Sequence, residues 1–301
     1  MAAFRNVALL GATGNLGTEI LAALNTAGFN VTAIQRKDSK NVATGAAKSI
    51  KVDLANASEL AEAFKGQDVV VSTVPTPKLV AEKAWIDAAV SAQVKRIVPS
   101  EFSTNMEVET SQTLPILKDK LEIRKYVEGL ASSGKIEWTS INNGPFLVNF
   151  LWLSGWMGPN PKTKTTTLHD GGEKIVCSST LERIGESVAK VLLPEHAEST
   201  KNKSIYVYSA AISEKQMSGI VSKVLGTELK ETNVSISSVV KETNDALAKG
   251  NTSKIMNFYI PFCFSEEYRG DFRYQAWNQK LGLKEMTNQE VEDLVKGWLS
   301  G

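Results

Sequence analysis

Three glycines follow a short apolar run near the start of the chain, in the stretch VALLGATGNLG of residues 7–17. Gly11, Gly14 and Gly17 are spaced three apart, and a helical pattern follows them. In a strand–turn–helix unit, the first glycine permits the tight turn, the second lets the backbone approach a pyrophosphate, and the third allows close helix packing. Unpaired N–H groups at a helix start also favour an anion. The spacing therefore predicts a dinucleotide site. The other expected contacts in this turn are Thr13, Asn15 and Leu16.

The next apolar run ends in IQRK, which contains Arg36 and Lys37. In dinucleotide-binding folds an acid at this place holds the ribose 2′-hydroxyl of NAD, whereas an arginine accommodates the 2′-phosphate of NADP. A guanidinium also suits bidentate phosphate binding. Arg36 therefore predicts NADP or NADPH, with Lys37 in support, and a solvated basic turn balanced by Asp38 is the alternative. Asp53 is expected either on the adenine side or as a cap of the following turn.

A second glycine signal, GLASSGK at residues 129–135, has the spacing of a nucleoside-triphosphate loop. Ile136 follows it, where Ser or Thr should hold magnesium. A helical pattern precedes this stretch and a strand pattern follows it, which is the reverse of what that loop requires. The stretch is therefore expected to end a helix.

A nicotinamide enzyme must position a proton donor, because the cofactor carries the hydride. Short-chain dehydrogenases commonly use Tyr-x-x-x-Lys on a helix for this purpose. None of the six tyrosines in this chain is followed four residues later by lysine. The helical pattern over residues 117–134 nevertheless contains Lys118 and Lys120, with Ile116 where the tyrosine would stand relative to Lys120.

The elements that must position these residues alternate between apolar runs and helical patterns. Nearly continuous apolar runs are typical of strands covered on both faces. The alternation predicts an α/β fold with a doubly wound parallel Rossmann sheet. Strands are expected at residues 4–10, 30–34, 49–54, 68–74, 94–100 and 135–142. Helices are expected at residues 18–28, 58–66 (capped by Ser58), 78–92 and 117–134.

The second half of the chain changes character. Residues 155–172 are rich in Gly, Pro and Thr and are expected to form a loop. Helices are expected at residues 182–193 and 213–226 and after the capping box of Thr287 and Glu290, and a strand at 203–209. We expect an NADP-binding Rossmann domain over residues 1–150. A smaller, partly interleaved C-terminal α/β domain should bind substrate over residues 151–301, with residues 180–210 returning to the Rossmann sheet.

Composition excludes several classes of function. The chain has 301 residues and a net charge of +1, so no charge excess indicates nucleic acid or an anionic membrane as a partner. Cys177 and Cys263 lie far apart and form no CxxC, so neither a zinc site nor a disulfide framework is expected. No segment approaches the ~18 apolar residues of a membrane span. The start of the chain does not resemble a signal peptide, and a cytoplasmic location is expected.

Several motifs together resemble a known family. SEF at 100–102, KLEIR at 120–124 and INNG at 141–144 are similar to the isoflavone reductase and phenylcoumaran benzylic ether reductase group. This group belongs to the NmrA-like, atypical short-chain dehydrogenases. The glycine turn, the Arg36 turn and the stretch DVVVSTVPTPKLVAEKAWIDAA also match, and the resemblance is strongest through residue 150.

The resemblance implies that Lys120 is catalytic, that it contacts the nicotinamide ribose, and that it acts as general acid or base without a tyrosine. An exposed helix charge paired with a nearby carboxylate is the alternative, and Lys118 is the competing lysine. The further cofactor contacts expected with this resemblance are Thr73, Val74, Pro75, Ser100, Glu101, Phe102, Asn143 and Phe146.

The chain also departs from the family pattern. Ser103 replaces the glycine of Ser-Glu-Phe-Gly, and residues 142–146 differ from the plant reductases and look more like fungal relatives. A plant phenylpropanoid substrate therefore does not follow from the resemblance. His169, beside Asp170, is expected to be structural or solvated. An aromatic-accepting pocket is one reading of Phe102, Phe146, Trp152 and Trp156, and ordinary packing is the other.

Three functions remain open at this point. The first is an NADPH-dependent reductase of a small aromatic or conjugated molecule, with Lys120 as general acid or base. The second is a non-catalytic NmrA-like regulator that senses the dinucleotide. The third is a related lyase, isomerase or epimerase. The substrate, the stereochemistry and the oligomeric state do not follow from the sequence, so a homodimer stays open.

Overall fold

The structure is a computed structural model that describes residues 4–75 and 82–301. The chain divides into two compact units, each assembled from segments far apart in the sequence. The first unit contains Met1–Phe102, Asp119–Asn142 and Leu181–Ile205, and the second contains Ser103–Lys118, Asn143–Thr180 and Tyr206–Gly301. The chain therefore crosses between the units several times. The roles expected for the two parts, cofactor binding and substrate binding, stay predictions.

The first unit is built on a seven-stranded sheet. Its strands are β1 (Asn6–Leu10), β2 (Asn30–Arg36), β3 (Lys48–Val52), β4 (Val69–Ser72), β5 (Arg96–Val98), β6 (Glu137–Asn142) and β10 (Lys203–Tyr206). They lie in the order β10-β6-β5-β4-β1-β2-β3. Every pair from β3 across to β6 is parallel. The prediction of a doubly wound Rossmann sheet is confirmed, because this order reverses direction between β1 and β4.

The strand sequences explain this arrangement. All four residues of β4 are buried, as is typical of a central strand covered on both faces. The edge strand β3 buries only Val52 completely. Leu10 of β1 is in register with Ile34 of β2 and with Ser72 of β4. The carboxyl ends of these central strands therefore lie close together at one edge of the sheet.

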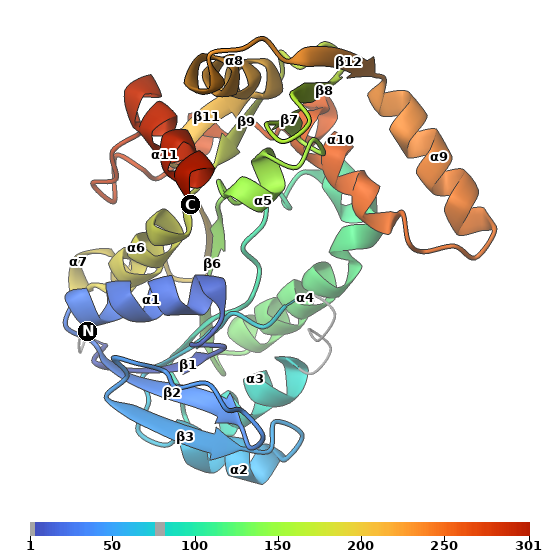
Figure 1. Cartoon of the computed structure of the whole chain (residues 1–301). Helices are drawn as coiled ribbons and strands as arrows, with labels where there is room; N and C mark the ends of the chain where they lie inside the picture. Colours follow the sequence, from blue (N-terminus) through green and yellow to red (C-terminus); the bar gives the residue numbers. More distant parts are fainter. Residues whose placement is uncertain (1–3, 76–81) are drawn as a thin grey trace. The chain divides into compact units, whose positions relative to one another are not determined.

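Helices cover both faces of this sheet (Figure 1). They are α1 (Asn15–Thr26), α2 (Ala57–Phe64), α3 (Glu82–Ser91), α4 (Lys118–Ser132), α6 (Leu181–Leu192) and α7 (Pro194–Ala197). The helices α2, α3 and α4 bury Phe64, Trp85 and Val127 in one apolar cluster with the strands. On the other face α1 and α6 lie side by side. A Cβ on Gly185 of α6 would lie 2.6 Å from the carbonyl oxygen of Glu19, so glycine allows this close approach.

Two helix ends refine the sequence predictions. The cap of α2 is Asn56 and not Ser58, because the Asn56 side chain accepts hydrogen bonds from the N–H groups of Ser58 and Glu59. At the end of α4, Gly134 adopts a φ of +70°, which favours glycine and confirms the predicted helix stop. Of the helix expected over residues 78–92, residues 78–81 lie outside the described part of the chain.

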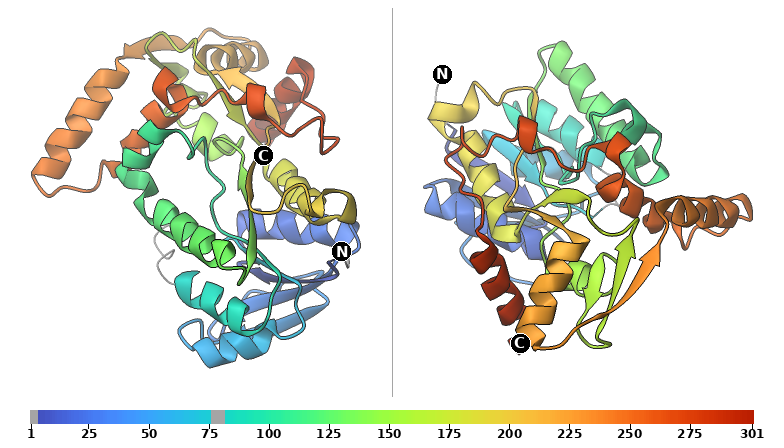
Figure 2. Two further views of the ribbon diagram at one scale, coloured as in Figure 1. Left: turned by 180° about the vertical axis from the view of Figure 1, so that it is seen from behind. Right: turned by 90° about the horizontal axis from the view of Figure 1, so that it is seen from above.

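The second unit combines two small sheets with helices. Its strands are β7 (Gly158–Asn160), β8 (Thr165–His169), β9 (Ile175–Ser178), β11 (Ala210–Ser213) and β12 (Lys230–Val234). Its helices include α5 (Asn149–Trp152), α8 (Glu214–Leu225), α9 (Ile236–Ala248), α10 (Tyr259–Phe264) and α11 (Asn288–Ser300). One sheet has the order β12-β8-β7, and β9 pairs with β11 in the other. Figure 2 shows β12 beside β8, although the two strands are far apart in the sequence.

The loop predicted for residues 155–172 is wrong in part. This stretch contains β7 and β8, which pair antiparallel from Gly158 opposite Thr167 to Asn160 opposite Thr165. Threonine is β-branched and suits strands, so the Thr-rich half continues the sheet despite the nearby Pro and Gly residues. The turn between the two strands includes Lys164, whose φ is +53°.

Two predictions for the helix ends of this unit are confirmed. Helix α8 ends at Gly226, which has a left-handed conformation, and Thr287 and Glu290 form the capping box of α11. Cys177 and Cys263 are free and buried. Burial raises the pKa of both thiols above the usual cysteine value. Within the described ranges, no helix is both long and apolar enough to span a membrane.

Candidate cofactor site and catalytic lysine

A cavity of about 950 Å³ lies in the first unit where the carboxyl ends of β1, β2, β3 and β4 meet. Ligands of open α/β sheets bind at this kind of edge, where the strand order reverses. The cavity therefore lies where the sequence predicts the dinucleotide. The predicted cofactor residues in its wall are Gly11, Thr13, Gly14, Arg36, Lys37, Asp53, Thr73, Val74 and Pro75.

The three glycines of the turn have different neighbours. Gly11 has a φ of +80°, and a Cβ there would lie 2.3 Å from Oγ1 of Thr73. A Cβ on Gly17 would lie 2.0 Å from the carbonyl oxygen of Gly11. At Gly14 the nearest atom would be 3.4 Å away, which is an ordinary contact. Packing therefore requires Gly11 and Gly17, whereas Gly14 leaves open the space that a bound pyrophosphate would need.

The start of α1 suits an anion. The first intrahelical bond runs from the Thr18 N–H to the Gly14 carbonyl at 2.9 Å. The amides of Asn15, Leu16 and Gly17 therefore precede the helical ladder. Gly14 offers no side-chain cap, and the first turn of α1 contains no acidic residue. Both features leave the positive end of the helix dipole available to a phosphate.

Two side-chain hydrogen bonds connect the segments that follow β4 and β5 to their neighbours. Oγ1 of Thr73 donates to the Leu10 carbonyl at 2.9 Å and joins β4 to β1. Oγ of Ser100 donates to the Val74 carbonyl at 2.7 Å and joins the chain after β5 to the chain after β4. These bonds connect the ends of β1, β4 and β5 at the carboxyl edge of the sheet.

The two basic residues after β2 differ in their surroundings. Nζ of Lys37 lies 2.7 Å from Oε1 of Glu59, and this hydrogen bond raises the pKa of Lys37. The pKa of Glu59 is lowered by the N–H of Asp53 and by Lys37. Arg36 makes only a loose contact with Asp38, with Nε 3.8 Å from Oδ1, and its side chain is 58% exposed. The guanidinium of Arg36 is therefore better placed to meet a ligand than the Lys37 ammonium.

Asp53 caps the turn before α2. Its Oδ1 accepts a hydrogen bond from the Ala55 N–H at 2.9 Å. Its own N–H donates to Oε2 of Glu59 at 2.9 Å. Of the two roles expected from the sequence, the structure therefore contains the turn cap, and Asp53 also lies in the cavity wall.

Lys120 is held at the carboxyl edge of the same unit. Its partly buried Nζ donates a hydrogen bond to the carbonyl of Glu101, in the segment that follows β5. Phe102, the next residue, is buried and has a φ of +27°, which is unusual for a residue other than glycine. Lys118, the competing lysine, is exposed at the first position of α4. The structure thus distinguishes a tethered lysine from a solvated one.

The Glu101 loop is itself anchored by α4. Nε of Arg124 donates to Oε2 of Glu101 at 2.9 Å, and both side chains are buried. Nη2 of Arg124 donates to Oγ of Ser140 at 2.7 Å, and the guanidinium lies 4.5 Å from the Trp138 ring centroid. Glu101 therefore positions Lys120 with its carbonyl while its carboxylate holds the helix.

Asn143 and Phe146 belong to the second unit. The Asn143 N–H donates to the Ser103 carbonyl at 2.8 Å, and its Nδ2 donates to the Gly144 carbonyl at 2.7 Å. Phe146 forms an isolated parallel bridge with Ser179. Their predicted contacts with the cofactor stay a prediction.

Of the two interpretations of the aromatic residues, a pocket or ordinary packing, Trp152 follows the second. Trp152 is completely buried in the core of the second unit, where its Nε1 donates to Oγ of Ser178 at 3.2 Å. It is therefore a core residue. Trp156 is partly buried and stacks on Tyr259, with 5.8 Å between the ring centroids.

His169 is structural, but it is not a loop residue. It ends β8, and its Nδ1 lies 2.7 Å from Oε1 of Glu214. The other carboxylate oxygen of Glu214 accepts the His169 N–H, also at 2.7 Å. Both side chains are buried, so this pair joins β8 to the start of α8.

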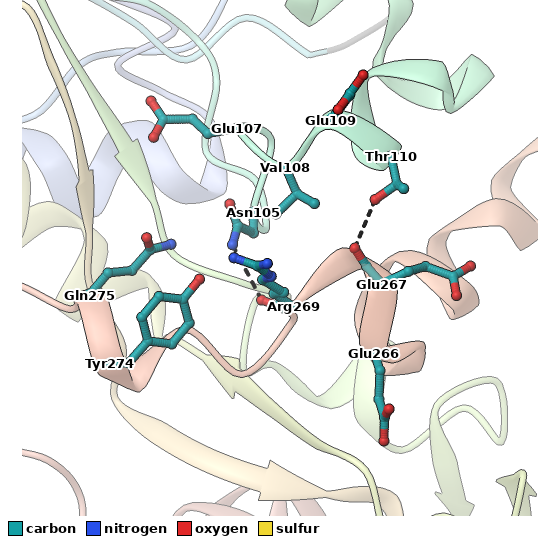
Figure 3. A pocket seen from close by; sticks show the side chains of 10 residues that line it. All are labelled: Asn105, Glu107, Val108, Glu109, Thr110, Glu266, Glu267, Arg269, Tyr274 and Gln275. Carbon is teal, nitrogen blue, oxygen red and sulfur yellow. Dashed lines mark hydrogen bonds between the residues drawn. The ribbon is translucent and has the colours of Figure 1, made fainter.

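A second cavity, of about 610 Å³, lies in the second unit. Figure 3 shows Arg269 beside Asn105, with Thr110 bonded to the Glu267 carbonyl at 2.7 Å. Its wall also contains Glu107, Glu109 and Glu266 and none of the predicted site residues. This acidic surface has no feature that points to a dinucleotide.

The first cavity also has wall residues that the sequence analysis missed. Gln35 and Asn41 flank the Arg36 turn, and Trp85 comes from α3. Gln35 interrupts the apolar run of β2, and this polar residue was the sequence signal that could have identified it as a site residue. Trp85 lies on a helix far along the chain, and no local pattern relates it to the glycine turn.

The strand order and the glycine turn define a Rossmann-type α/β protein. The chain belongs to the NmrA-like family, whose model matches residues 5–297. This confirms the family predicted from the sequence motifs.

Individual relatives agree with this membership. Oxidoreductase aprR of Aspergillus flavus is 31% identical over 97% of this chain and 99% of that protein. Isoflavone reductase homolog P3 of Arabidopsis thaliana is 25% identical over 80% of this chain and 81% of its own length. The solved structure described as AtPrR2 with NADP+ and (+)pinoresinol has a TM-score of 0.80 at 21% identity, and it covers 99% of both chains. That structure supports the fold.

Proposed function

We propose that this protein is an NADPH-dependent reductase of a small aromatic or conjugated molecule. The observation that carries the proposal is the cavity of about 950 Å³ where the glycine turn and Arg36 meet at the carboxyl edge of the sheet. The similarity to oxidoreductase aprR, and to the fold of a reductase bound to NADP+, supports it.

The residues of the cavity fit this cofactor. The amides at the start of α1 would bind the pyrophosphate, and the open space at Gly14 would let the backbone approach it. The Arg36 guanidinium would bind the 2′-phosphate, because a planar fork of donors matches phosphate oxygens. Asp53 would lie on the adenine side, since it shares the same wall.

The bound cofactor would supply the hydride, and the chain would supply position and a proton. Lys120 is the proposed general acid, with its ammonium oriented by the Glu101 carbonyl. The Lys120 ammonium would give one proton to the substrate oxygen on which negative charge develops. Solvent then reprotonates the neutral amine.

The second unit is the proposed source of the substrate wall. The expected substrate domain, residues 151–301, lies in this unit except for the returning segment that ends at Ile205. Phe146 and Trp156 are its proposed aromatic contacts, whereas Trp152 is excluded by its complete burial.

Fluorescence titration and turnover test this function together. We expect NADPH to bind more tightly than NADH, and to be oxidised in the presence of an enone, a quinone methide precursor or an aryl ether. A regulator that senses the dinucleotide would bind NADP+ and NADPH with different affinities and turn over nothing. A lyase or isomerase would form product without net consumption of NADPH.

A further inference from the structure

We propose that Gln35, a buried glutamine at the end of β2, determines the preference for the 2′-phosphate by fixing the turn that carries Arg36. The inference rests on the proposed function, because it concerns the cofactor assigned there. Gln35 is a positioning residue, since it acts through Arg36.

The carboxamide of Gln35 holds the turn from its inner side. The residue is only 7% exposed. Its Nε2 donates to the Asn41 carbonyl at 2.9 Å and lies 3.5 Å from Oγ of Ser39. The Ser39 N–H donates in turn to the Arg36 carbonyl at 3.0 Å. One buried amide therefore holds Ser39 and Asn41 in place, and Ser39 is itself hydrogen-bonded to the Arg36 backbone.

Strand β3 fastens the same turn from the other side. The Lys37 N–H donates to the Val52 carbonyl at 3.1 Å. Nζ of Lys51 donates to the Ser39 carbonyl at 2.8 Å. With Gln35 in place, the backbone from residue 36 to residue 41 is held at both ends and in the middle. The Arg36 side chain then leaves a fixed backbone, although it is itself exposed.

A fixed backbone matters most for an exposed arginine. A guanidinium that binds phosphate must align its planar donors, and ordering a long side chain together with a loose loop costs conformational entropy. The Gln35 bonds remove the loop part of this cost before the ligand arrives. NADH has no 2′-phosphate and gains nothing from the alignment of Arg36, so the effect is specific to the phosphorylated cofactor.

The burial of an amide at this position also needs a reason. The neighbouring residues of β2, Ala33 and Ile34, are apolar and buried. An apolar side chain would satisfy the strand without the desolvation cost of a carboxamide. Polar residues that interrupt a buried apolar run often serve a site rather than the fold. At Gln35 the bonded groups are all in the turn that follows Arg36.

The test measures dissociation constants of NADPH and NADH by fluorescence for the wild type, Gln35→Met and Gln67→Met. Gln67 is the matched control, since its Nε2 bonds Oγ1 of Thr32 on β2 at 3.4 Å without touching the turn. For Gln35→Met we expect the dissociation constant of NADPH to rise about tenfold, because Arg36 must then be ordered together with a loose turn. Binding of NADH should change less than about twofold. Gln67→Met should keep the wild-type ratio.

An unchanged NADPH to NADH ratio in Gln35→Met overturns the inference, and so does an equal loss for both cofactors. If Gln35→Met does not fold, Lys51→Met replaces it, because Lys51 is exposed and holds the same turn. Lys48→Met on the same strand then controls for the lost charge. A ratio in Lys51→Met equal to that of Lys48→Met also overturns the inference. Failure of the wild type to bind NADPH at all would instead reject the proposed function.

Discussion

The carboxylate of Glu101 and the guanidinium of Arg124 form a buried ion pair between the chain after β5 and helix α4. The same glutamate offers its backbone carbonyl to Lys120. One residue thus links the stability of the first unit to the orientation of the proposed catalytic ammonium. The two contributions can be tested separately, because Arg124 and Lys120 can be substituted one at a time.

Arg124→Met should destabilise the protein strongly. It leaves the Glu101 carboxylate buried without its partner, and such a loss costs about 3–5 kcal/mol. Urea denaturation measures the change in the free energy of unfolding. Lys125→Met on the exposed side of the same helix is the control and should cost less than about 0.5 kcal/mol. Equal effects of the two substitutions would contradict the importance of the buried pair.

Gly14→Ala and Gly17→Ala should have opposite consequences. A Cβ at position 14 meets only an ordinary 3.4 Å contact, so the variant should fold normally. It should bind NADPH at least about tenfold more weakly, because the methyl group occupies space next to the pyrophosphate. A Cβ at position 17 lies 2.0 Å from a backbone oxygen, so this variant should unfold at lower temperature. Thermal melts and NADPH titration distinguish the two, and normal NADPH affinity in Gly14→Ala would count against the site.

Lys120→Met should lower turnover strongly while NADPH still binds. A positioned general acid contributes about 10²–10⁴-fold, so kcat should fall by that factor. Lys118→Met removes an equal charge from the exposed position two residues earlier and should retain activity. Stopped-flow measurement of NADPH oxidation gives both rates. Similar rates for the two variants would remove Lys120 from the mechanism.

Stability should fall in acid partly through Glu137. Burial alone would raise the pKa of this carboxyl, but hydrogen bonds from Lys201 and Arg96 outweigh it and hold the pKa below the usual value. A depressed pKa in the folded state means that the stabilisation is complete above the unfolded pKa, about 4.3, and is lost as pH falls through the folded value.

The measurement for Glu137 is urea denaturation at several pH values. Glu137→Gln should differ most from the wild type near pH 7 and approach it below about pH 4. A difference between the two proteins that does not depend on pH would show that Glu137 acts only through packing.

The strands of the first unit could be predicted because their signals are local. Runs such as Val69–Ser72 are apolar throughout, and the glycines at 11, 14 and 17 mark the turn between strand and helix. The hairpin of β7 and β8 was missed because its Thr, Pro and Gly residues are also typical of loops. Its pairing depends on tertiary contacts that no local window contains.

The hydrogen-bond partners of the site residues could not be predicted, because they lie far away in the sequence. Arg36 was identified from its place after β2, but the partner of Lys37 is Glu59 on a separate helix. The tether of Lys120 to Glu101 spans a segment that packs in the other unit. Side-chain partners of this kind are set by the fold, so a motif identifies a candidate residue without its hydrogen bonds.

The position of β10 at the margin of the sheet has a consequence for synthesis on the ribosome. This strand begins at Lys203, so β6 gains this neighbour only after all the other strands of the sheet have been made. Until then β6, whose residues 138–142 are buried in the folded protein, is the edge strand of the sheet and can associate with other chains. Chaperones that bind nascent chains should therefore raise the yield of this folded protein more than the yield of proteins whose sheets are completed early.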